Sequence, residues 1–385
     1  MEHLNPLSTI PSEISRDIFS RLEVRQLLIA QCVSKEWYSF IQHIKLSYTG
    51  QPRTLLLTLR PCRDGEHWEV RSISPDLRSQ RLPDFTCHLS SVNHYANAYS
   101  SRVWGSCNGF VLVAYGKHIL MWNPLTSWST KVLELQSLHG YIVMGGLCYN
   151  PFTSDYKAVL LLRTAEEVHG QCVIVSSLKN KEWTEVSFPY LYMASRDSVN
   201  FNNTFHWIVR SEHGHIHDYF DDLRCCNRIV YFDPVDDTFK ILPSPKPISP
   251  EEEDSVVGAG IIDGCFCMAR KDSWRQVIQV SVMKEYGKAE SWITYFSMSI
   301  LKFAPQDAYD LRFLSQNGNK VLVTSRSFGR TYVYVVEEDK LERVGFDGDC
   351  TISACICFYI GSFDLPREVS WGYDDDEHKC SRVFL

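Results

Sequence analysis

The chain has 385 residues, of which 44% are hydrophobic and 22% are charged, and its formal net charge is −7. These values are ordinary for globular proteins and argue against wholesale disorder. The length favours two unequal units, or one large domain with an appendage. The acidic balance comes without a dense basic patch that would face phosphates, so nucleic acid is not an expected partner.

Cysteine usage and hydropathy bear on the cellular compartment. The 14 cysteines are scattered rather than framed by regular spacings. The first residues lack the basic and then apolar stretch of a secretory signal, and no run approaches the roughly 18 apolar residues that a membrane-spanning helix needs. We therefore expect an intracellular protein, cytoplasmic, nuclear or both, with reduced thiols and no membrane contact.

Residues 10–44 carry the pattern of three short helices. Pro11 stands where helix starts tolerate proline, and Glu13 falls in the first turn, where a negative charge favours the helix dipole. Ser34 is suited to cap the third helix. Large apolar residues recur at helical spacing along all three segments: Ile14, Ile18, Phe19 and Leu22, then Val24, Leu27 and Leu28, then Trp37, Phe40, Ile41 and Ile44.

This helical segment is small for the apolar surface that it carries. A unit of about 40 residues is near the lower limit of independent stability and buries little of its own surface. The pattern fits two structures: a helical cap packed on the following domain, or a docking module whose apolar side chains contact a partner protein. Composition and spacing leave both open.

The same segment resembles a plant-type F-box. The likeness is carried by Ile10-Pro11-Ser12-Glu13-Ile14, Ile18-Phe19-Ser20-Arg21-Leu22, Leu27-Leu28 and Cys32-Val33-Ser34-Lys35-Glu36-Trp37. In that family the module docks on the Skp-type adaptor of a cullin-RING ubiquitin ligase. The resemblance implies a set of adaptor contacts, some of which must instead hold the module's own core: Pro11, Ile14, Ile18, Phe19, Leu22, Leu27, Leu28, Val33 and Trp37.

From residue 100 onward, short apolar runs alternate with turn signals. One pattern recurs: a strand, a tight turn, a polar stretch, and an aromatic or large apolar residue that opens the next strand. The opening residues are spaced by 55, 56, 53 and 49 positions: Trp128, Trp183, Phe239, Trp292 and Leu341. A period near 50 predicts kelch-like propeller blades rather than shorter solenoid repeats. A twisted β-sandwich is the alternative.

Hairpin signals precede the apolar strands in most of these units. Asparagine, aspartate and glycine pairs supply the positive φ angles that two-residue hairpins require: Asn108-Gly109, Asn202-Asn203, Asp263-Gly264 and Asn317-Gly318. Further strands are predicted within 54–73 and within 351–360. Pairing these two ends would close a sixth blade and remove exposed edges. The predicted fold is mainly β, with a small N-terminal α module followed by a kelch-like β-propeller of about six blades.

The region from about residue 100 to 360 also resembles the F-box-associated domain of plant F-box proteins. The likeness rests on Gly105-Ser106-Cys107-Asn108-Gly109, Trp122-Asn123-Pro124, Tyr149-Asn150-Pro151, Phe205-His206-Trp207 and Val282-Met283-Lys284-Glu285-Tyr286. In that family the domain recruits a substrate and has no chemistry of its own. The two resemblances together imply an F-box module at 5–48, a propeller domain at 50–363 and an acidic tail at 364–385.

Several patterns suggest chemistry but have simpler structural interpretations. Cys107 has the spacing of a nucleophile elbow, yet a strand is predicted after it where an elbow needs a helix. The glycines at 258–264 echo a dinucleotide loop, with the third glycine one residue late. The alternating His213, His215 and His217 are suited to a metal, but they fall in a long polar segment. We therefore predict no catalytic residue, no metal and no cofactor.

The leading hypothesis is a substrate receptor of a Skp-cullin-F-box ubiquitin ligase. It would bind the Skp-type adaptor, and through it the cullin and RING subunits, while one face of the propeller holds an unidentified target protein. Its contribution to catalysis would be proximity rather than chemistry. The alternatives are an enzyme on a propeller scaffold with a helical cap, and a scaffold whose helices bind another partner.

Two long polar segments are candidates for the target-binding surface, because loops longer than about 4–6 residues are usually functional or disordered. Residues 244–255 are Pro-rich and end in an acidic run. Residues 209–227 are longer and hold the side chains that we single out: His213, His217, Tyr219 and Phe220. A tolerated insertion is the alternative for the longer segment.

Overall fold

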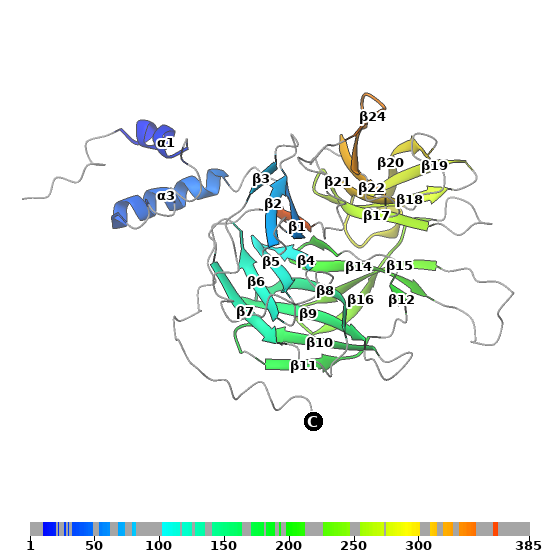
Figure 1. Cartoon of the computed structure of the whole chain (residues 1–385), viewed down its shortest axis with the longest axis horizontal. Helices are drawn as coiled ribbons and strands as arrows, with labels where there is room; N and C mark the ends of the chain where they lie inside the picture. The colour runs from blue at the N-terminus through cyan, green and yellow to red at the C-terminus, as the bar shows by residue number, and fades with distance from the viewer. Residues whose placement is uncertain are drawn as a thin grey trace, which may run out of the picture.

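The structure is a computed structural model of the chain. It describes residues 11–20, 22, 27, 30, 33–48, 54–61, 68–73, 79–81, 102–115, 118–124, 128–134, 141–163, 171–180, 182–188, 192–193, 198–211, 226–246, 255–272, 275–300, 309–313, 319–325, 331–343 and 357–360. The two helices with described bounds are α1 (Ser12–Ser20) and α3 (Lys35–Tyr48), and they lie to one side of the strands (Figure 1). The predicted second helix lies mostly outside the described residues.

The described residues beyond the helices form sheets whose neighbouring strands pair antiparallel, apart from one parallel pair. Three of these sheets have four strands. Their orders are β25 (Cys357–Ile360), β1 (Thr54–Pro61), β2 (Trp68–Ile73) and β3 (Ser79–Arg81); β4 (Arg102–Cys107), β5 (Phe110–Tyr115), β6 (His118–Asn123) and β7 (Trp128–Glu134); and β8 (Tyr141–Asn150), β9 (Asp155–Arg163), β10 (Gln171–Ser177) and β11 (Glu182–Val186).

The remaining two sheets are larger. The first contains β12 (Tyr192–Met193), β14 (Thr204–Ser211), β15 (Cys226–Asp233) and β16 (Thr238–Leu242), with β13 (Val199–Phe201) also paired to β14. The second runs β20-β19-β18-β17-β21-β22-β23-β24, with these bounds: β17 (Ser255–Ile262), β18 (Cys265–Asp272), β19 (Val277–Met283), β20 (Trp292–Ser299), β21 (Tyr309–Phe313), β22 (Lys320–Ser325), β23 (Thr331–Val335) and β24 (Lys340–Arg343).

The eight-stranded sheet consists of two antiparallel halves that touch through one parallel residue pair, Gly258 with Leu311. A Cβ atom on Gly258 would lie 2.6 Å from the carbonyl oxygen of Leu311, so glycine is what lets the two inner strands meet. Each half repeats the four-stranded arrangement of the other sheets. The mainly β prediction with N-terminal helices is confirmed, whereas the count of about six blades stays a prediction.

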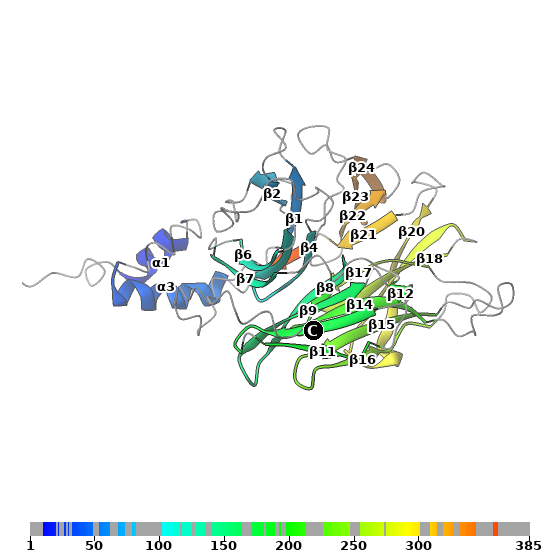
Figure 2. The ribbon, with the colours of Figure 1, turned by 60° about the horizontal axis from the view of Figure 1, so that its bottom comes forward.

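The two ends of the β region meet in one sheet. Strand β25, from the C-terminal side, pairs with β1 from Thr54 opposite Ile360 to Leu57 opposite Cys357. The predicted pairing of the first and last strands is therefore confirmed, and Figure 2 shows the two segments side by side from a second direction. This pairing removes two strand edges that an open array would expose.

The period near 50 has a definite structural meaning. Trp128 begins β7 opposite Asn123, and Trp292 begins β20 opposite Met283. The other three landmarks are each the second residue of their strand: Trp183 in β11, Phe239 in β16 and Leu341 in β24. Every landmark therefore marks the hairpin from the third strand to the outermost strand of a group.

The predicted tight turns between first and second strands are confirmed where they are described. Their residues have positive φ angles: Asn108 (47°), Gly109 (83°), Asn202 (52°), Asn203 (63°), Asp263 (50°) and Gly264 (68°). The Asn317-Gly318 pair lies outside the described residues.

The main core lies between the sheets and is dominated by aromatic side chains. Phe110, Trp122 and Trp207 are fully buried, as expected for strands covered on both faces. Glycines on an inner strand allow close approach between sheets: a Cβ atom on Gly146 would lie 2.4 Å from the ring of Phe205.

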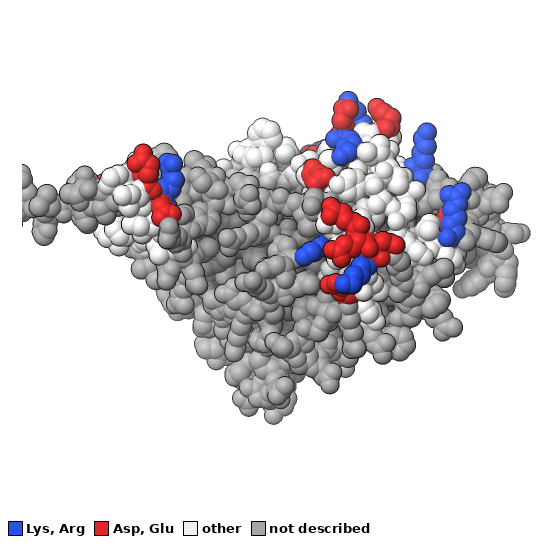
Figure 3. All heavy atoms as spheres, turned by 90° about the horizontal axis from the view of Figure 1, so that it is seen from above, with Lys and Arg blue, Asp and Glu red and all other residues white. Residues whose placement is uncertain are grey.

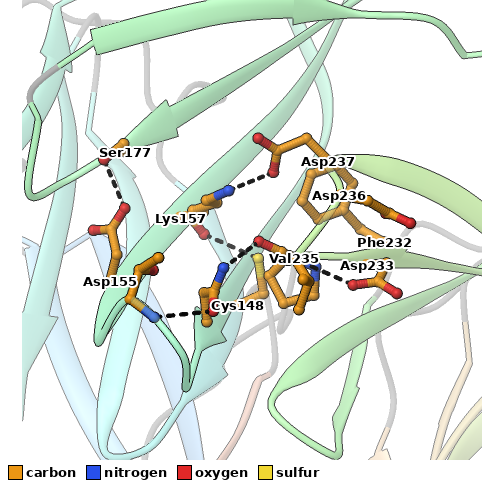
Figure 4. A network of polar contacts seen from close by, with 12 residues as sticks. Cys148, Asp155, Lys157, Ser177, Phe232, Asp233, Val235, Asp236 and Asp237 are labelled. Carbon is orange, nitrogen blue, oxygen red and sulfur yellow. Dashed lines mark hydrogen bonds and ion pairs between the residues drawn. The ribbon is translucent and has the colours of Figure 1, made fainter.

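A polar network ties two neighbouring sheets together (Figure 4). The Nζ atom of Lys157 in β9 lies 2.6 Å from Oδ1 of Asp237 in the β15–β16 turn. Asn150 donates its side-chain N–H to the carbonyl oxygen of Pro234 at 2.9 Å. Lys157 is buried, so removing Asp237 would leave an uncompensated charge. These contacts hold the sheets at a fixed spacing.

Candidate functional site

The helical module has a small core of its own. Phe19, Leu27, Ala30 and Ile41 are buried together, and no described residue of the strands belongs to this cluster. The ring of Phe19 meets that of Trp37 edge-to-face, with centroids 5.0 Å apart. The described part of this core is therefore built from residues of the helical module alone.

The helix ends follow local chemistry that was readable in the sequence. The backbone N–H of Trp37 donates to Oγ of Ser34 at 3.2 Å, which confirms the predicted cap of α3. The N–H of Ser15 donates to the carbonyl oxygen of Pro11 at 3.0 Å, so Pro11 lies at the start of α1. These hydrogen bonds mark where α1 and α3 begin.

The predicted adaptor contacts separate into two sets. Phe19 and Leu27 are buried in the module's core, and Leu22 and Trp37 are half-buried against it. Pro11 is exposed. Three apolar side chains remain about half exposed: Ile14 (52%), Ile18 (47%) and Val33 (59%). Leu28 lies outside the described residues.

Ile14 and Ile18 lie one helical turn apart on α1, so they share one face of that helix. Sequence reasoning missed Tyr38, which is also exposed on α3. Its position directly after Trp37, off the apolar stripe of α3, was the available signal. We name the exposed set Ile14, Ile18, Val33 and Tyr38, together with Pro11, the helical docking surface.

The strand connections of the β region divide it into two faces. In an antiparallel group, the turns from first to second strand and from third to fourth strand lie at one end of the strands. The other connections lie at the opposite end. We call the first the hairpin face and the second the loop face. Because Thr54 at the start of β1 pairs with Ile360 at the end of β25, the first residue of β1 and the last residue of β25 both lie on the hairpin face.

Both predicted target-binding segments begin and end on the loop face. The β14–β15 connection leaves at Ser211 and returns at Cys226, from a second to a third strand. The β16–β17 connection leaves at Leu242 and returns at Ser255, from a fourth strand to the next first strand. The topology therefore brings the ends of these two segments to the face opposite the start of β1 and the end of β25.

The predicted bounds of the longer segment were wrong at both ends. Val209 to Ser211 belong to β14 and pair with residues 226–228 of β15. Strand pairing uses backbone groups, so polar residues such as Arg210 and Asn227 extend a ladder as well as apolar ones do. His213, His217, Tyr219 and Phe220 lie outside the described residues, and their role stays a prediction.

The backbone around Cys107 does not have the strand–turn–helix conformation of a nucleophile elbow. It ends β4, the Asn108-Gly109 turn follows, and β5 begins at Phe110, so the segment is strand–turn–strand. The side chain is buried, and burial raises the pKa of its thiol to about 12. Gly258 and Gly260 lie inside β17 rather than at a helix start, and Gly264 lies in the turn that follows this strand.

Within the residues that the structure describes, no group of three or more His, Cys, Asp or Glu side chains is arranged to hold a metal ion. The helices of that same part of the chain include none that is long and apolar enough to cross a membrane.

Charged side chains crowd the turn between β23 and β24. Glu337, Glu338 and Asp339 are exposed there, and Lys340 pairs with Glu342 at 2.7 Å. Figure 3 shows acidic and basic side chains gathered over this side of the β region, with an uncharged area between them.

Comparison with known proteins matches both regions of the chain. Residues 65–363 match the F-box associated beta propeller domain, and residues 7–49 match the F-box-like domain. The F-box protein CPR1 of Arabidopsis thaliana is 25% identical over 79% of this chain and 76% of its own length. The F-box/kelch-repeat protein At3g23880 of the same plant is 25% identical over 75% of this chain and 79% of its own.

A chain in the crystal structure of a nidogen/laminin complex aligns with a TM-score of 0.46 at 8% identity, over 80% of this chain and 99% of its own length. Similarity at that level carries no functional argument. The match to the F-box associated domain covers most of the chain and confirms the propeller fold. This chain belongs to the family of plant F-box proteins that carry an F-box associated β-propeller domain.

Proposed function

We propose that this protein is the substrate receptor of a Skp-cullin-F-box ubiquitin ligase. The observation that carries the proposal is the helical docking surface beside a core that is already filled. Aliphatic side chains that are exposed singly are ordinary on a protein surface, but Ile14 and Ile18 are both exposed one turn apart on the same face of α1. Neighbouring exposed apolar side chains are typical of a protein–protein interface. The partner is a Skp-type adaptor, which brings the cullin and RING subunits.

The β-propeller would hold the target protein on its loop face. The chain from the F-box reaches β1 on the hairpin face, and the two long connections start and finish on the other. This separation leaves the target-binding surface free of the adaptor. The chain would act without chemistry of its own, by raising the effective concentration of target lysines near the ubiquitin-charged enzyme, in the cytoplasm or the nucleus.

Adaptor binding is tested by substituting the helical docking surface without disturbing the module's core. Ile14→Asp combined with Ile18→Asp would put two unpaired carboxylates into the interface. We expect co-purification of the adaptor to be lost. Trp37 is left unchanged because it packs on Phe19, and its removal would disturb the module itself.

The matched control is Ile241→Asp on β16, whose side chain is 51% exposed but lies outside the module. It should retain the adaptor at the level of the unchanged protein. The docking proposal fails if the double variant keeps its melting temperature and still retrieves the adaptor.

Target binding is tested on the loop face. Replacing residues 212–225 with a short Gly-Ser linker keeps β14 and β15 intact. With degradation blocked, purification followed by mass spectrometry should then recover the adaptor but lose the target proteins. Recovery of both at unchanged levels would move the target-binding surface elsewhere on the propeller.

A further inference from the structure

The turn between β19 and β20 (residues 284–291) lies on the hairpin face and is held by its own backbone. The N–H of Lys284 donates to the carbonyl oxygen of Ser291 at 3.1 Å. The N–H of Lys288 donates to the carbonyl oxygen of Glu285, also at 3.1 Å. The turn is therefore a compact unit that can move as a whole.

Tyr286 packs from this turn onto the neighbouring sheet. Its ring lies against three rings of that sheet, with centroid distances of 5.4 Å to Phe201, 5.8 Å to His206 and 6.3 Å to Tyr231. These three residues belong to β13, β14 and β15, so one side chain contacts three strands. Tyr286 is still 37% exposed.

The hydrogen bonds of His206 determine which of its ring nitrogens carries the proton. Nδ1 lies 3.2 Å from the carbonyl oxygen of Val199, which can only accept, so Nδ1 carries the hydrogen. In the neutral ring Nε2 is then an acceptor, and the hydroxyl of Tyr286, 2.7 Å away, donates to it. Consecutive hydrogen bonds therefore join the β19–β20 turn to β14 and β13.

The surroundings of His206 disfavour a positive charge on its ring. His206 is 1% exposed, and Phe201 and Phe266, which do not titrate, pack on it from β13 and β18. The titratable groups that face the ring are the hydroxyls of Tyr231 on β15 and of Tyr286. Burial lowers the pKa of His206 to about 4, because the water that would solvate an imidazolium is excluded.

The charged side chains of the adjoining elements are paired with one another. Asp233 of β15 pairs with Lys240 at 2.5 Å, and Glu285 pairs with Lys288 within the turn. Burial, and then the neighbouring Tyr231 and Asp233, raise the pKa of Tyr286, so its hydroxyl keeps its proton and remains a donor. The proton that can change at this contact is therefore the one on His206.

We propose that His206 and Tyr286 form a clasp between neighbouring sheets that holds while the imidazole is neutral, and that protonation of the ring releases the β19–β20 turn while the strands stay paired. A charged imidazole needs water. The turn can move away without breaking a strand ladder, whereas the other residues around the ring stand in paired strands.

The clasp gives a role to two sequence patterns that suggested no chemistry. His206 is the middle residue of Phe205-His206-Trp207, and Tyr286 ends the pattern that begins at Val282. The inference stands apart from the proposed function, because it concerns neither the helical docking surface nor the loop face.

Amide hydrogen exchange of the full chain at pH 6.5 and at pH 4, corrected for the intrinsic pH dependence of exchange, measures how often the turn opens. An opened ring titrates near pH 6.5 and the clasped ring near pH 4, so the open state gains stability as the pH falls between them. The opening constant at Lys284, Lys288 and Ser291 should rise on the order of 80-fold. The amides of β14 should stay protected.

Two variants separate the two halves of the clasp. His206→Gln has no titrating ring, so its turn should open equally often at both pH values. Tyr286→Phe keeps the aromatic ring but loses the donor, and its turn should open about fivefold more often at pH 6.5. The matched control is Tyr295→Phe, whose hydroxyl donates to Asp263 at 2.8 Å. It should leave exchange in the turn within twofold of the unchanged chain.

A second measurement needs no substitution at His206. Nitrogen NMR of the chain labelled with ¹⁵N-histidine identifies the His206 ring as the one whose Nε2 signal Tyr286→Phe shifts. That ring should be neutral at pH 5, with its proton on Nδ1.

Three results would overturn the proposal. The first is a His206 ring that carries its proton on Nε2. The second is a turn that opens no more often at pH 4 than at pH 6.5, or whose opening rises as steeply in folded His206→Gln as in the unchanged chain. The third is that the amides of β14 lose protection together with those of the turn, because the release would then be global unfolding.

Discussion

The helical module and the β-propeller use the same kinds of side chain in opposite ways. The module buries Phe19 and Leu27 and leaves Ile14, Ile18 and Val33 exposed. The propeller buries the large aromatic side chains of its core, such as Trp122 and Trp207, and places charges on most of its outer strands. The helical module therefore leaves apolar side chains exposed for a partner, whereas the propeller buries its core aromatic side chains and so stabilises its own fold. Residue type alone does not distinguish the two.

If the propeller is stabilised by its own closure, removing the closing strand should have the largest effect. Deleting residues 350–385 removes β25 and opens the edge of β1. We expect the melting temperature of the β domain to fall by on the order of 10 °C or more. Deleting 364–385 is the control and should leave it unchanged. Equal melting of both truncated chains would contradict closure.

Two substitutions at neighbouring positions test which apolar side chains of the module are buried in its core and which are exposed. Phe19→Ala removes a buried ring and should destabilise the module by about 3–5 kcal/mol, which accelerates amide exchange in α1. Ile18→Ala alters an exposed position and should change stability by no more than about 0.5 kcal/mol. If the two variants exchange alike, the assignment of core and surface is wrong.

The propeller should respond to acid through one buried histidine. The Nε2 atom of His206 lies 2.7 Å from the hydroxyl oxygen of Tyr286, and burial lowers the pKa of His206 to about 4. The unfolded chain takes up this proton near pH 6.5, so between about pH 6.5 and 4 the unfolded state binds more protons. The free energy of unfolding should therefore decrease by about 3 kcal/mol as the pH is lowered from 6.5 to 4.

His206→Gln removes the group and should flatten this part of the pH profile. Urea denaturation of the full chain at several pH values measures the slope. An unchanged slope in the variant would mean that other groups cause the acid sensitivity.

Close packing between sheets is tested at Gly146. A valine there would meet the ring of Phe205, whose nearest atoms lie 2.4 Å from the position of a Cβ atom. We expect a loss of about 1–3 kcal/mol. Gly287→Asn is the control: its φ is +85° with open space around it, and asparagine tolerates the left-handed region. Comparable losses in the two variants would show that backbone conformation, not packing, matters at Gly146.

Much of the fold was predictable because it depends on local signals. Asn108-Gly109 fixes a tight turn through its own φ angles, and Ser34 caps α3 through a bond to Trp37. The landmarks from Trp128 to Leu341 recur because each group of strands repeats one hairpin. Such features need no knowledge of distant residues.

The features that sequence reasoning missed depend on contacts between distant segments. Whether Phe19 or Ile18 faces the core is decided by how α1 packs on α3. The first strand of one sheet is split into β12 and β13, which both pair with β14. The role of Gly258 appears only when Leu311, far along the chain, lies beside it. The predicted loop at 209–227 was too long because polar residues can extend a strand ladder.

The central claim is that the two regions divide the work, with the helical module alone binding the adaptor. Amide hydrogen exchange of the full chain, with and without a Skp-type adaptor, tests it most directly. Our account predicts slower exchange in α1 and α3 (Ser12–Ser20 and Lys35–Tyr48), and no change in the described strands between Arg102 and Arg343. Protection of the strands with none in the helices would contradict it.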